Sequence, residues 1–284
     1  MRKLLMKIED LHYAYSEEKA ALNGINLEIY EGERVAVLGS NGAGKSTFFL
    51  NINGVLRPEH GAIYYRDKKI TYKKSDLNEL RKNVGIVFQD ADNQIIASTV
   101  LGEVSFGPMN LKLPKDEVIK RVDEALEYMN LTEFKNRPPH YLSGGEKKRV
   151  SIADIIAMQS EMIIFDEPTA ALDPHNAQML EGVLSNLADE GKTLLISTHD
   201  VDFAYRWAER ILVFDNGEII ADGKPIEIFK SDEILKKANL KRPMLLDIYE
   251  MLVSKGLLPN QAAYPTNINE FKEILGCPKI GWLR

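Results

Sequence analysis

A glycine-rich segment near residue 40 has the residue types needed to bind phosphate groups. Glycines let successive backbone N–H groups point at phosphate oxygens, and the positive end of a following helix adds to the attraction. A lysine after the last glycine reaches the β- and γ-phosphates of a nucleotide, and the next hydroxyl binds Mg²⁺. The segment Gly39-Ser40-Asn41-Gly42-Ala43-Gly44-Lys45-Ser46 fits the pattern G-x-x-x-x-G-K-[ST] at every position. We therefore predict a phosphate loop.

Two acids end an apolar segment further along the chain. Asp166 and Glu167 directly follow Met162–Phe165. An acid at the end of a buried strand beside a phosphate loop is placed to hold Mg²⁺ through its water shell, a role that Asp166 fits. Glu167, one residue on, can orient and polarise an attacking water. Taken alone, the pair would also fit a solvated strand end, but the phosphate loop favours the catalytic interpretation.

A second glycine pair begins a long helical stretch. In Leu142-Ser143-Gly144-Gly145-Glu146, two glycines leave N–H groups bare at the helix N-terminus. Together with the Ser143 hydroxyl they predict a second anion site. A pattern of only five residues would also serve as a plain helix cap.

Short apolar segments separated by helical stretches predict the scaffold that positions these residues. Such segments are typical of strands buried in a parallel sheet whose faces are covered by helices. A predicted helix begins at Lys45 and ends near Gly54, directly after the phosphate loop. The predicted strands are residues 1–8, Ile25–Ile29, Glu33–Leu38, Val84–Phe88, Met162–Phe165 and Thr193–Ser197, with a hairpin of Arg210–Phe214 and Glu218–Ala221.

Helices are also expected outside this sheet. Pro114 can open a helix whose apolar face contains Val118, Val122, Ala125 and Met129. Beyond about residue 225 the chain becomes a helical appendage. Its apolar residues are expected to pack on their own chain, with dimer stabilisation as the alternative. They are Leu245, Ile248 and Leu252 in a run from Pro243 to Gly256, and Ile268, Phe271, Ile274 and Leu275 after a capping box of Asn267 and Glu270.

Composition limits the class of protein. The chain has 284 residues, of which 44% are hydrophobic and 27% charged, as in a folded globular protein of roughly two domains. A net charge of −6 disfavours a nucleic-acid partner, because phosphate contacts need a basic surface. The single cysteine, Cys277, allows no internal disulfide. The apolar segments are far shorter than the ~18 residues that a membrane-spanning helix needs, so any membrane role requires a partner.

The order of these motifs resembles the nucleotide-binding subunit of an ABC transporter over about residues 3–225. The resemblance implies an α/β fold of the ABC type of P-loop NTPase, with a mainly parallel core sheet and an antiparallel β portion. It implies a nucleotide-binding domain at 1–225, containing a helical subdomain at about 95–160, and a C-terminal helical appendage at 226–284. The matching motifs are the phosphate loop at 39–46, Gln89, Leu142–Glu146, Asp166-Glu167, Ala171-Leu172-Asp173 and His199. Glu146 departs from the family, which often has glutamine there.

The resemblance also implies a role for each matching residue. Tyr15 would stack on adenine, with Tyr13 as the competing candidate. Asp173 would communicate across a dimer. The implied catalytic residues are Lys45, Gln89, Glu167 and His199, the last of which contacts the γ-phosphate. The implied Mg²⁺ ligands are Ser46, Gln89 and Asp166, and the implied ATP-binding set is Tyr15, Gly39, Ser40, Asn41, Gly42, Ala43, Gly44, Lys45, Ser46, Thr47, Ser143, Gly144 and Gly145.

In the family, two such subunits face each other head to tail. Each ATP lies between the phosphate loop of one subunit and the residues matching 143–145 of the other. The resemblance therefore implies ATP and Mg²⁺ as cofactors, a second ATP-binding subunit in a homo- or heterodimer, and integral membrane transport subunits. It implies no nucleic-acid partner. It places the chain at the cytoplasmic face of the cell membrane as a peripheral protein.

The segment after Gln89 is similar to the energy-coupling-factor group of ABC transporters. The informative residues are Gln94 and Phe106-Gly107, whereas Ala91 replaces the proline of that group. The group energises importers of cobalt and of vitamins, and we favour cobalt over the vitamin alternative. A soluble ABC ATPase acting in DNA repair or translation is a further alternative, disfavoured by the acidic charge. A purely regulatory binding module is disfavoured because Lys45 and the two acids are intact.

Overall fold

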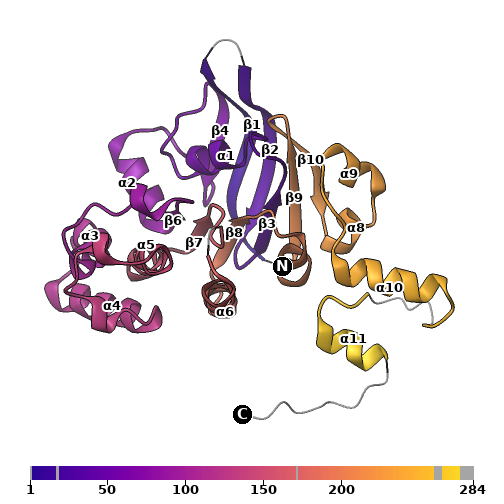
Figure 1. Cartoon of the computed structure of the whole chain (residues 1–284). Coiled ribbons are helices and arrows are strands. Elements are labelled where there is room, and N and C mark those ends of the chain that lie inside the picture. The colour runs from indigo at the N-terminus through magenta and orange to yellow at the C-terminus, as the bar shows by residue number, and fades with distance from the viewer. Residues whose placement is uncertain (1, 17–18, 171, 259–263, 276–284) are drawn as a thin grey trace.

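The computed structural model describes residues 2–16, 19–170, 172–258 and 264–275, and in it two sheets are flanked by groups of helices (Figure 1). The larger sheet has six strands in the order β10-β9-β3-β8-β7-β6. Five of them are parallel, and β10 pairs with β9 as an antiparallel hairpin. The bounds are β3 Arg34–Leu38, β6 Val84–Val87, β7 Met162–Phe165, β8 Thr193–Ser197, β9 Arg210–Asp215 and β10 Glu218–Gly223. These strands lie where the sequence predicts them, and each residue of β3, β6, β7 and β8 is buried or nearly so.

The smaller sheet is antiparallel, in the order β2-β1-β4-β5, and differs from prediction in length. Its strands are β1 Leu4–Ser16, β2 Lys19–Tyr30, β4 His60–Tyr65 and β5 Lys68–Lys69. The predicted strands 1–8 and Ile25–Ile29 were too short. The pairing of β1 with β2 contains several register shifts, which interrupt the alternation of apolar and polar residues that identifies a strand.

Helices α1 and α2 accompany the two sheets, whereas α3, α4 and α5 form a separate group at the left of Figure 1. The predicted face of α4 is confirmed, because Val122, Ala125 and Met129 are buried and Val118 packs against them. The bounds are α1 Lys45–Ile52, α2 Lys74–Asn83, α3 Val100–Asn110, α4 Lys115–Tyr128, α5 Gly144–Met158, α6 Pro174–Asp189 and α7 Val201–Trp207, with short 3-10 helices at Ala91–Asn93, Thr132–Phe134 and Pro139–Tyr141.

In the described residues after the core sheet the helices are α8 Pro225–Phe229, α9 Asp232–Lys237, α10 Met244–Ser254 and α11 Ile268–Ile274. The predicted face of α10 was offset, because Leu246 and Tyr249 are buried while Ile248 is 36% exposed. Apolar residues surround most of this helix, so their periodicity does not select a face. Leu246 instead packs against α8 and α9, and these contacts determine which face of α10 is buried. Asn267 caps α11 as expected.

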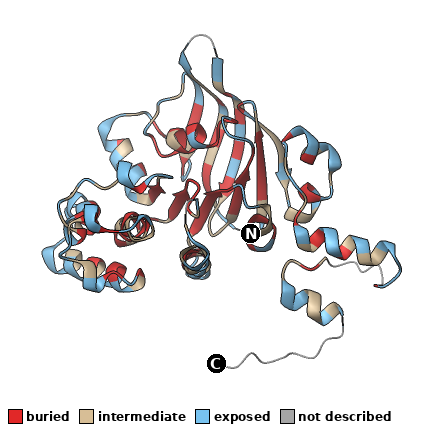
Figure 2. Ribbon diagram, viewed as in Figure 1, coloured by how far each residue is buried: buried red, intermediate tan, exposed pale blue. Residues whose placement is uncertain are grey.

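Burial is concentrated on the strands and on the inner sides of the helices (Figure 2). Within the ranges that the structure describes, no helix combines the length and the apolar character needed to cross a bilayer. Cys277 and Ala171 lie outside the described residues.

Candidate functional site

The phosphate loop connects β3 to α1 and requires glycine at two positions. Gly39 has φ +142°, and a Cβ there would lie 2.3 Å from the carbonyl oxygen of Phe214. Gly44 has φ +109°, and a Cβ there would lie 2.7 Å from the carbonyl oxygen of Ala21. The loop is therefore held closely between β9 and β2, and its backbone leads directly into the N-terminus of α1.

Lys45 lies folded back over this loop. Its Nζ donates hydrogen bonds to the carbonyl oxygens of Gly39 at 2.7 Å and Ser40 at 3.3 Å. The Glu167 carboxylate is 3.9 Å away. Burial lowers the pKa of Lys45, and the nearby carboxylates of Glu167 and Asp166 partly oppose that effect. The amine is thus positioned in the interior of the site, beside backbone oxygens that an anionic ligand can replace.

Asp166 and Glu167 follow β7 and are fixed by a residue that the sequence analysis did not identify. The buried Oγ of Ser197, at the end of the neighbouring strand β8, donates to Asp166 Oδ1 at 2.6 Å. The same oxygen accepts the backbone N–H of Glu167 at 2.8 Å. Ser197 reaches both acids because β7 and β8 are parallel neighbours in the sheet, a pairing that the residues around Ser197 do not indicate.

The side chain of Glu167 meets a histidine from the next loop. Its Oε1 lies 3.1 Å from Nε2 of His199 and has no hydrogen-bond partner among the described residues. Nε2 of His199 also contacts Oδ1 of Asn41 at 2.9 Å. Burial raises the pKa of Glu167, against the lowering effects of His199 and Lys45. A buried carboxylate with a raised pKa suits a group that accepts a proton from water.

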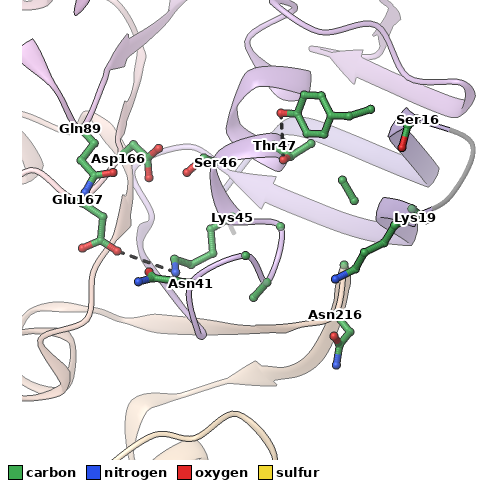
Figure 3. Close-up of a pocket in the computed structure, with 17 residues that line it drawn as sticks. Ser16, Lys19, Asn41, Lys45, Ser46, Thr47, Gln89, Asp166, Glu167 and Asn216 are labelled. Carbon is green, nitrogen blue, oxygen red and sulfur yellow. Dashed lines mark hydrogen bonds and ion pairs between the residues drawn. The ribbon is translucent and has the colours of Figure 1, made fainter. Parts of the chain in front are cut away.

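Asn41, Lys45, Asp166 and Glu167 line one cavity of about 400 Å³, which is within the range for a nucleotide-sized ligand (Figure 3). The predicted residue His199 does not line it and reaches the site through Glu167 and Asn41. Lys19 and Asn216 lie on the side opposite Glu167, and the sequence analysis missed both. No motif points to them, because Lys19 lies at the turn end of β2 and Asn216 in the turn of the β9–β10 hairpin. The predicted residues that line the cavity are Tyr15, Asn41, Gly42, Ala43, Gly44, Lys45, Ser46, Thr47, Gln89, Asp166 and Glu167.

Of the two tyrosine candidates for contact with adenine, only Tyr15 lines the cavity. Tyr15 lines it, is 64% exposed, and has its hydroxyl 3.3 Å from Oγ1 of Thr47. Tyr13 does not line it and packs against the core instead. The rings of the two tyrosines make an edge contact with centroids 5.0 Å apart. The geometry therefore favours Tyr15 as the ring that meets a base.

The residues suited to Mg²⁺ converge on the same cavity. Ser46 supplies a hydroxyl, Gln89 an amide oxygen and Asp166 a carboxylate, which are the hard oxygen ligands that this ion prefers. All three come from different elements: the start of α1, the loop after β6 and the end of β7. The donor set fits the ion.

The second predicted anion site lies apart from this cavity. Ser143 caps α5, and the Glu146 carboxylate accepts from its backbone N–H at 2.7 Å and its hydroxyl at 2.8 Å. These hydrogen bonds lower the pKa of Glu146. Neither Ser143 nor the two glycines after it line the nucleotide-sized cavity, and a Cβ on Gly144 would meet nothing within 4 Å. The chain therefore does not bring its own helix N-terminus to its own phosphate loop.

Two other predicted residues have local structural partners. Asp173 caps α6 by accepting hydrogen bonds from Asn176. Gln94 accepts from the backbone N–H of Phe88 and donates to the carbonyl oxygen of Ser151 at 3.4 Å. Gln94 thereby connects the end of β6 to α5 and fixes the loop that contains Gln89.

Comparison with known proteins gives the class of this protein. Residues 22–170 match the family model described as ABC transporter. Because that match spans more than half of the 284 residues, the chain belongs to the ABC transporter family. It is an ATPase of that family, and the predictions of fold class and enzyme class are confirmed.

Individual relatives narrow the comparison. The energy-coupling factor transporter ATP-binding protein EcfA of Methanocaldococcus jannaschii is 48% identical over 255 residues, which cover 90% of this chain and 91% of that protein. The structure of cbiO1 from Clostridium perfringens, part of the ABC transporter complex cbiONQ, is 42% identical with a TM-score of 0.73, covering 88% of this chain and 99% of that one. The dimeric ATP-binding cassette MJ0796, bound to ADP and Pi after hydrolysis, is 34% identical with a TM-score of 0.71, covering 78% and 99%.

Proposed function

We propose that this chain is the ATP-hydrolysing subunit of an energy-coupling factor importer, bound to the cytoplasmic face of the cell membrane through integral membrane subunits. The observation that carries the proposal is the meeting of Lys45 and Glu167 in one nucleotide-sized cavity, with Nε2 of His199 3.1 Å from the Glu167 carboxylate. The relatives named EcfA, and a neighbour that is part of the complex cbiONQ, support the transporter assignment.

Each of these groups has a proposed task in ATP hydrolysis. Lys45 exchanges its contacts with loop carbonyls for the β- and γ-phosphate oxygens. Glu167 orients and polarises the attacking water, and His199 contacts the γ-phosphate while holding Glu167. Positioning and charge neutralisation supply most of the catalysis in phosphoryl transfer. Mg²⁺ held by Ser46, Gln89 and Asp166 would supply further neutralisation of phosphate charge.

The N-terminus of α5 is proposed to complete the site of a second subunit. Ser143 and Gly144 are exposed, Gly145 is half-buried beside Asn176, and none of the three lines the cavity of their own chain. A head-to-tail pair brings them to the phosphates of the partner, so ATP holds the pair closed and hydrolysis releases it. Either a homodimer or a pair of related subunits satisfies this geometry. The dimeric cassette structures among the neighbours support it.

Gln89 and α3 are proposed to connect hydrolysis to the membrane subunits. Gln89 lines the nucleotide-sized cavity and also a second cavity of about 130 Å³ beside Gly144. Phe106 and Met109 are large exposed apolar residues on the neighbouring helix α3, as expected for a surface that a membrane subunit covers. We further propose residues 1–225 as the nucleotide-binding domain, with its helical subdomain at about 95–160, and 226–284 as a helical appendage.

The proposed cargo is cobalt, with a vitamin as the alternative. This assignment rests on the similarity of the segment after Gln89 to the energy-coupling-factor group and on the cbiO1 neighbour. The cargo is carried by the membrane subunits, so residues of this chain do not select between the two.

The experiment that tests the function is a tagged pull-down from detergent-solubilised native membranes, with identification of the captured proteins. Recovery of a few integral membrane proteins supports the importer, and uptake of radiolabelled Co²⁺ by vesicles of that complex tests the cargo. A Glu167→Gln complex should retain its subunits but lose uptake. Ribosomal or DNA-bound partners without a membrane protein would contradict the transporter assignment.

A further inference from the structure

Three side chains with metal-binding atoms meet on the antiparallel sheet, outside the nucleotide-sized cavity. Asp10 and His12 belong to β1, and His60 is the first residue of β4. Oδ1 of Asp10 lies 2.9 Å from Nε2 of His12, and Oδ2 lies 3.1 Å from Nδ1 of His60. One carboxylate thus bridges two imidazoles across neighbouring strands.

The backbone at this point is shaped to hold the three residues together. Glu9 pairs with Ala62 and His12 with His60, so β1 contains one more residue than β4 between these pairs. This bulge places Asp10 in the left-handed region at φ +47°. A Cβ on Gly61 would lie 2.3 Å from the carbonyl oxygen of Asp10, so only glycine allows β4 to approach this closely. The sheet therefore fixes the positions from which the three side chains converge.

A neighbouring side chain fixes Asp10 further. The backbone N–H of Asp10 donates a hydrogen bond to Oδ1 of Asn26 on β2 at 3.0 Å. The hydrogen bond from His12 lowers the pKa of Asp10, with a smaller contribution from His60. Hydrogen bonds thus hold both the backbone and the carboxylate of Asp10 in place.

The donor set is the one that borderline divalent metals prefer. Imidazole nitrogen and carboxylate oxygen bind Zn²⁺ at about 2.0–2.2 Å, and imidazole also suits Ni²⁺ and Co²⁺. In a tetrahedral site those bond lengths put ligand atoms roughly 3.4 Å apart. The observed separations of 2.9 and 3.1 Å start from different oxygens of Asp10, and one ligand atom from each of the three residues lies within 4.8 Å of the others. A small outward rotation of exposed side chains would admit an ion where protons are now shared.

We propose that Asp10, His12 and His60 form a binding site for a divalent transition-metal ion of the Zn²⁺, Ni²⁺ or Co²⁺ type. The side chains are 55%, 35% and 71% exposed, so water has access to complete the coordination. The bound ion would cross-link β1 to β4. The site is independent of the proposed transport function, because none of its three residues lines the nucleotide-sized cavity.

The test is metal titration of the full-length, tag-free protein without nucleotide and in excess Mg²⁺, in a Cys277→Ser background that removes the single thiol. Calorimetry with Zn²⁺ and Ni²⁺, and the visible absorption of bound Co²⁺, report binding. We expect one metal ion to bind per chain, with an affinity that depends on His60. Since loss of an outer-shell partner alone costs about 10- to 100-fold in metal affinity, His60→Gln, His12→Gln and Asp10→Asn should each weaken binding at least about tenfold.

The matched control is His140→Gln, which removes an exposed histidine from outside this cluster and should leave the affinity unchanged. A second measurement uses stability. Zn²⁺ should raise the thermal unfolding midpoint of the unsubstituted protein more than that of His60→Gln at the same Zn²⁺ concentration, because the native state of the former binds the ion more tightly. Equal metal affinity and equal midpoint shifts in the unsubstituted protein and in His60→Gln would overturn the proposal.

Discussion

The nucleotide-sized cavity and the N-terminus of α5 both combine glycines with the start of a helix, but different numbers of elements contribute to them. The cavity collects residues from β1, β2, α1 and the carboxyl ends of β6 and β7. Its central groups, Lys45 and Glu167, are buried and in contact with one another. At α5, a single helix provides Ser143 and two glycines, and their only described side-chain partner is Glu146 on the same turn.

This difference teaches which part of the chemistry the chain holds by itself. Carboxyl ends of parallel strands meet at one edge, so the core sheet places the phosphate loop beside the acids without help from another molecule. The α5 terminus does not reach the nucleotide-sized cavity, and its Gly144 borders a smaller cavity of about 130 Å³ instead. We infer that ATP binding belongs to one subunit, whereas closure and hydrolysis need two.

The largest expected effect is a loss of ATP hydrolysis on substitution of Glu167 in the nucleotide-sized cavity. Replacing Glu167 with Gln removes the group that polarises water, so hydrolysis should fall by about 10²–10⁴-fold. ATP binding should persist, because the phosphate contacts of Lys45 remain. Steady-state phosphate release and nucleotide-dependent size-exclusion profiles measure the two effects, and an ATP-stabilised dimer should accumulate.

Glu133→Gln is the matched control, since Glu133 is an exposed acid remote from the cavity lining. It should turn over ATP at the unsubstituted rate. Turnover by Glu167→Gln within a few-fold of that rate, with no trapped dimer, would rule out the role proposed for Glu167.

The next largest effect is expected from a substitution at the N-terminus of α5. Replacing Ser143 with Arg puts a long side chain on the surface that faces the partner, so ATP-dependent dimers and hydrolysis should be lost. A single subunit should still bind ATP with unchanged affinity. Ser143→Ala is the control for the lost helix cap, which costs about 0.5–2 kcal/mol. If the arginine variant formed ATP dimers as the alanine variant does, the comparison between the two regions would be wrong.

A smaller effect sharpens the outline of the cavity. Tyr15→Ala removes the ring that lines it, and loss of base–aromatic stacking costs about 1–3 kcal/mol, or roughly 5- to 150-fold in affinity. Tyr13→Ala should lower stability but change ATP affinity little, because Tyr13 packs on the core. Fluorescent-nucleotide titration of both variants measures the difference. A larger loss in Tyr13→Ala would reverse the assignment.

These cases show how far sequence reasoning reached. The phosphate loop, the buried parallel strands and the acids after β7 were predictable, because each is encoded by adjacent residues with a strict pattern. Ser197 was not identified, although it fixes both acids, because its role exists only once β8 lies beside β7. The lengths of β1 and β2 were underestimated because bulges interrupt their periodicity. The buried face of α10 was misplaced because contacts with neighbouring helices determine it.

The smallest effect concerns Glu146, where the family often has glutamine. The pKa of Glu146 is lowered in the folded chain by its hydrogen bonds to Ser143, so its stabilising effect is present above the unfolded pKa and is lost as the pH falls through the folded pKa. Glu146→Gln keeps an acceptor for the Ser143 N–H but removes a charge at a helix N-terminus, a charge that contributes about 0.3–1 kcal/mol. Urea unfolding of both proteins should show that difference at pH 7, and it should shrink below about pH 4.3. ATPase activity should be nearly unchanged. A stability difference that stayed constant down to pH 3.5 would show that the charge of Glu146 does not act through this cap, and a large loss of activity would instead place Glu146 in the contact with the partner.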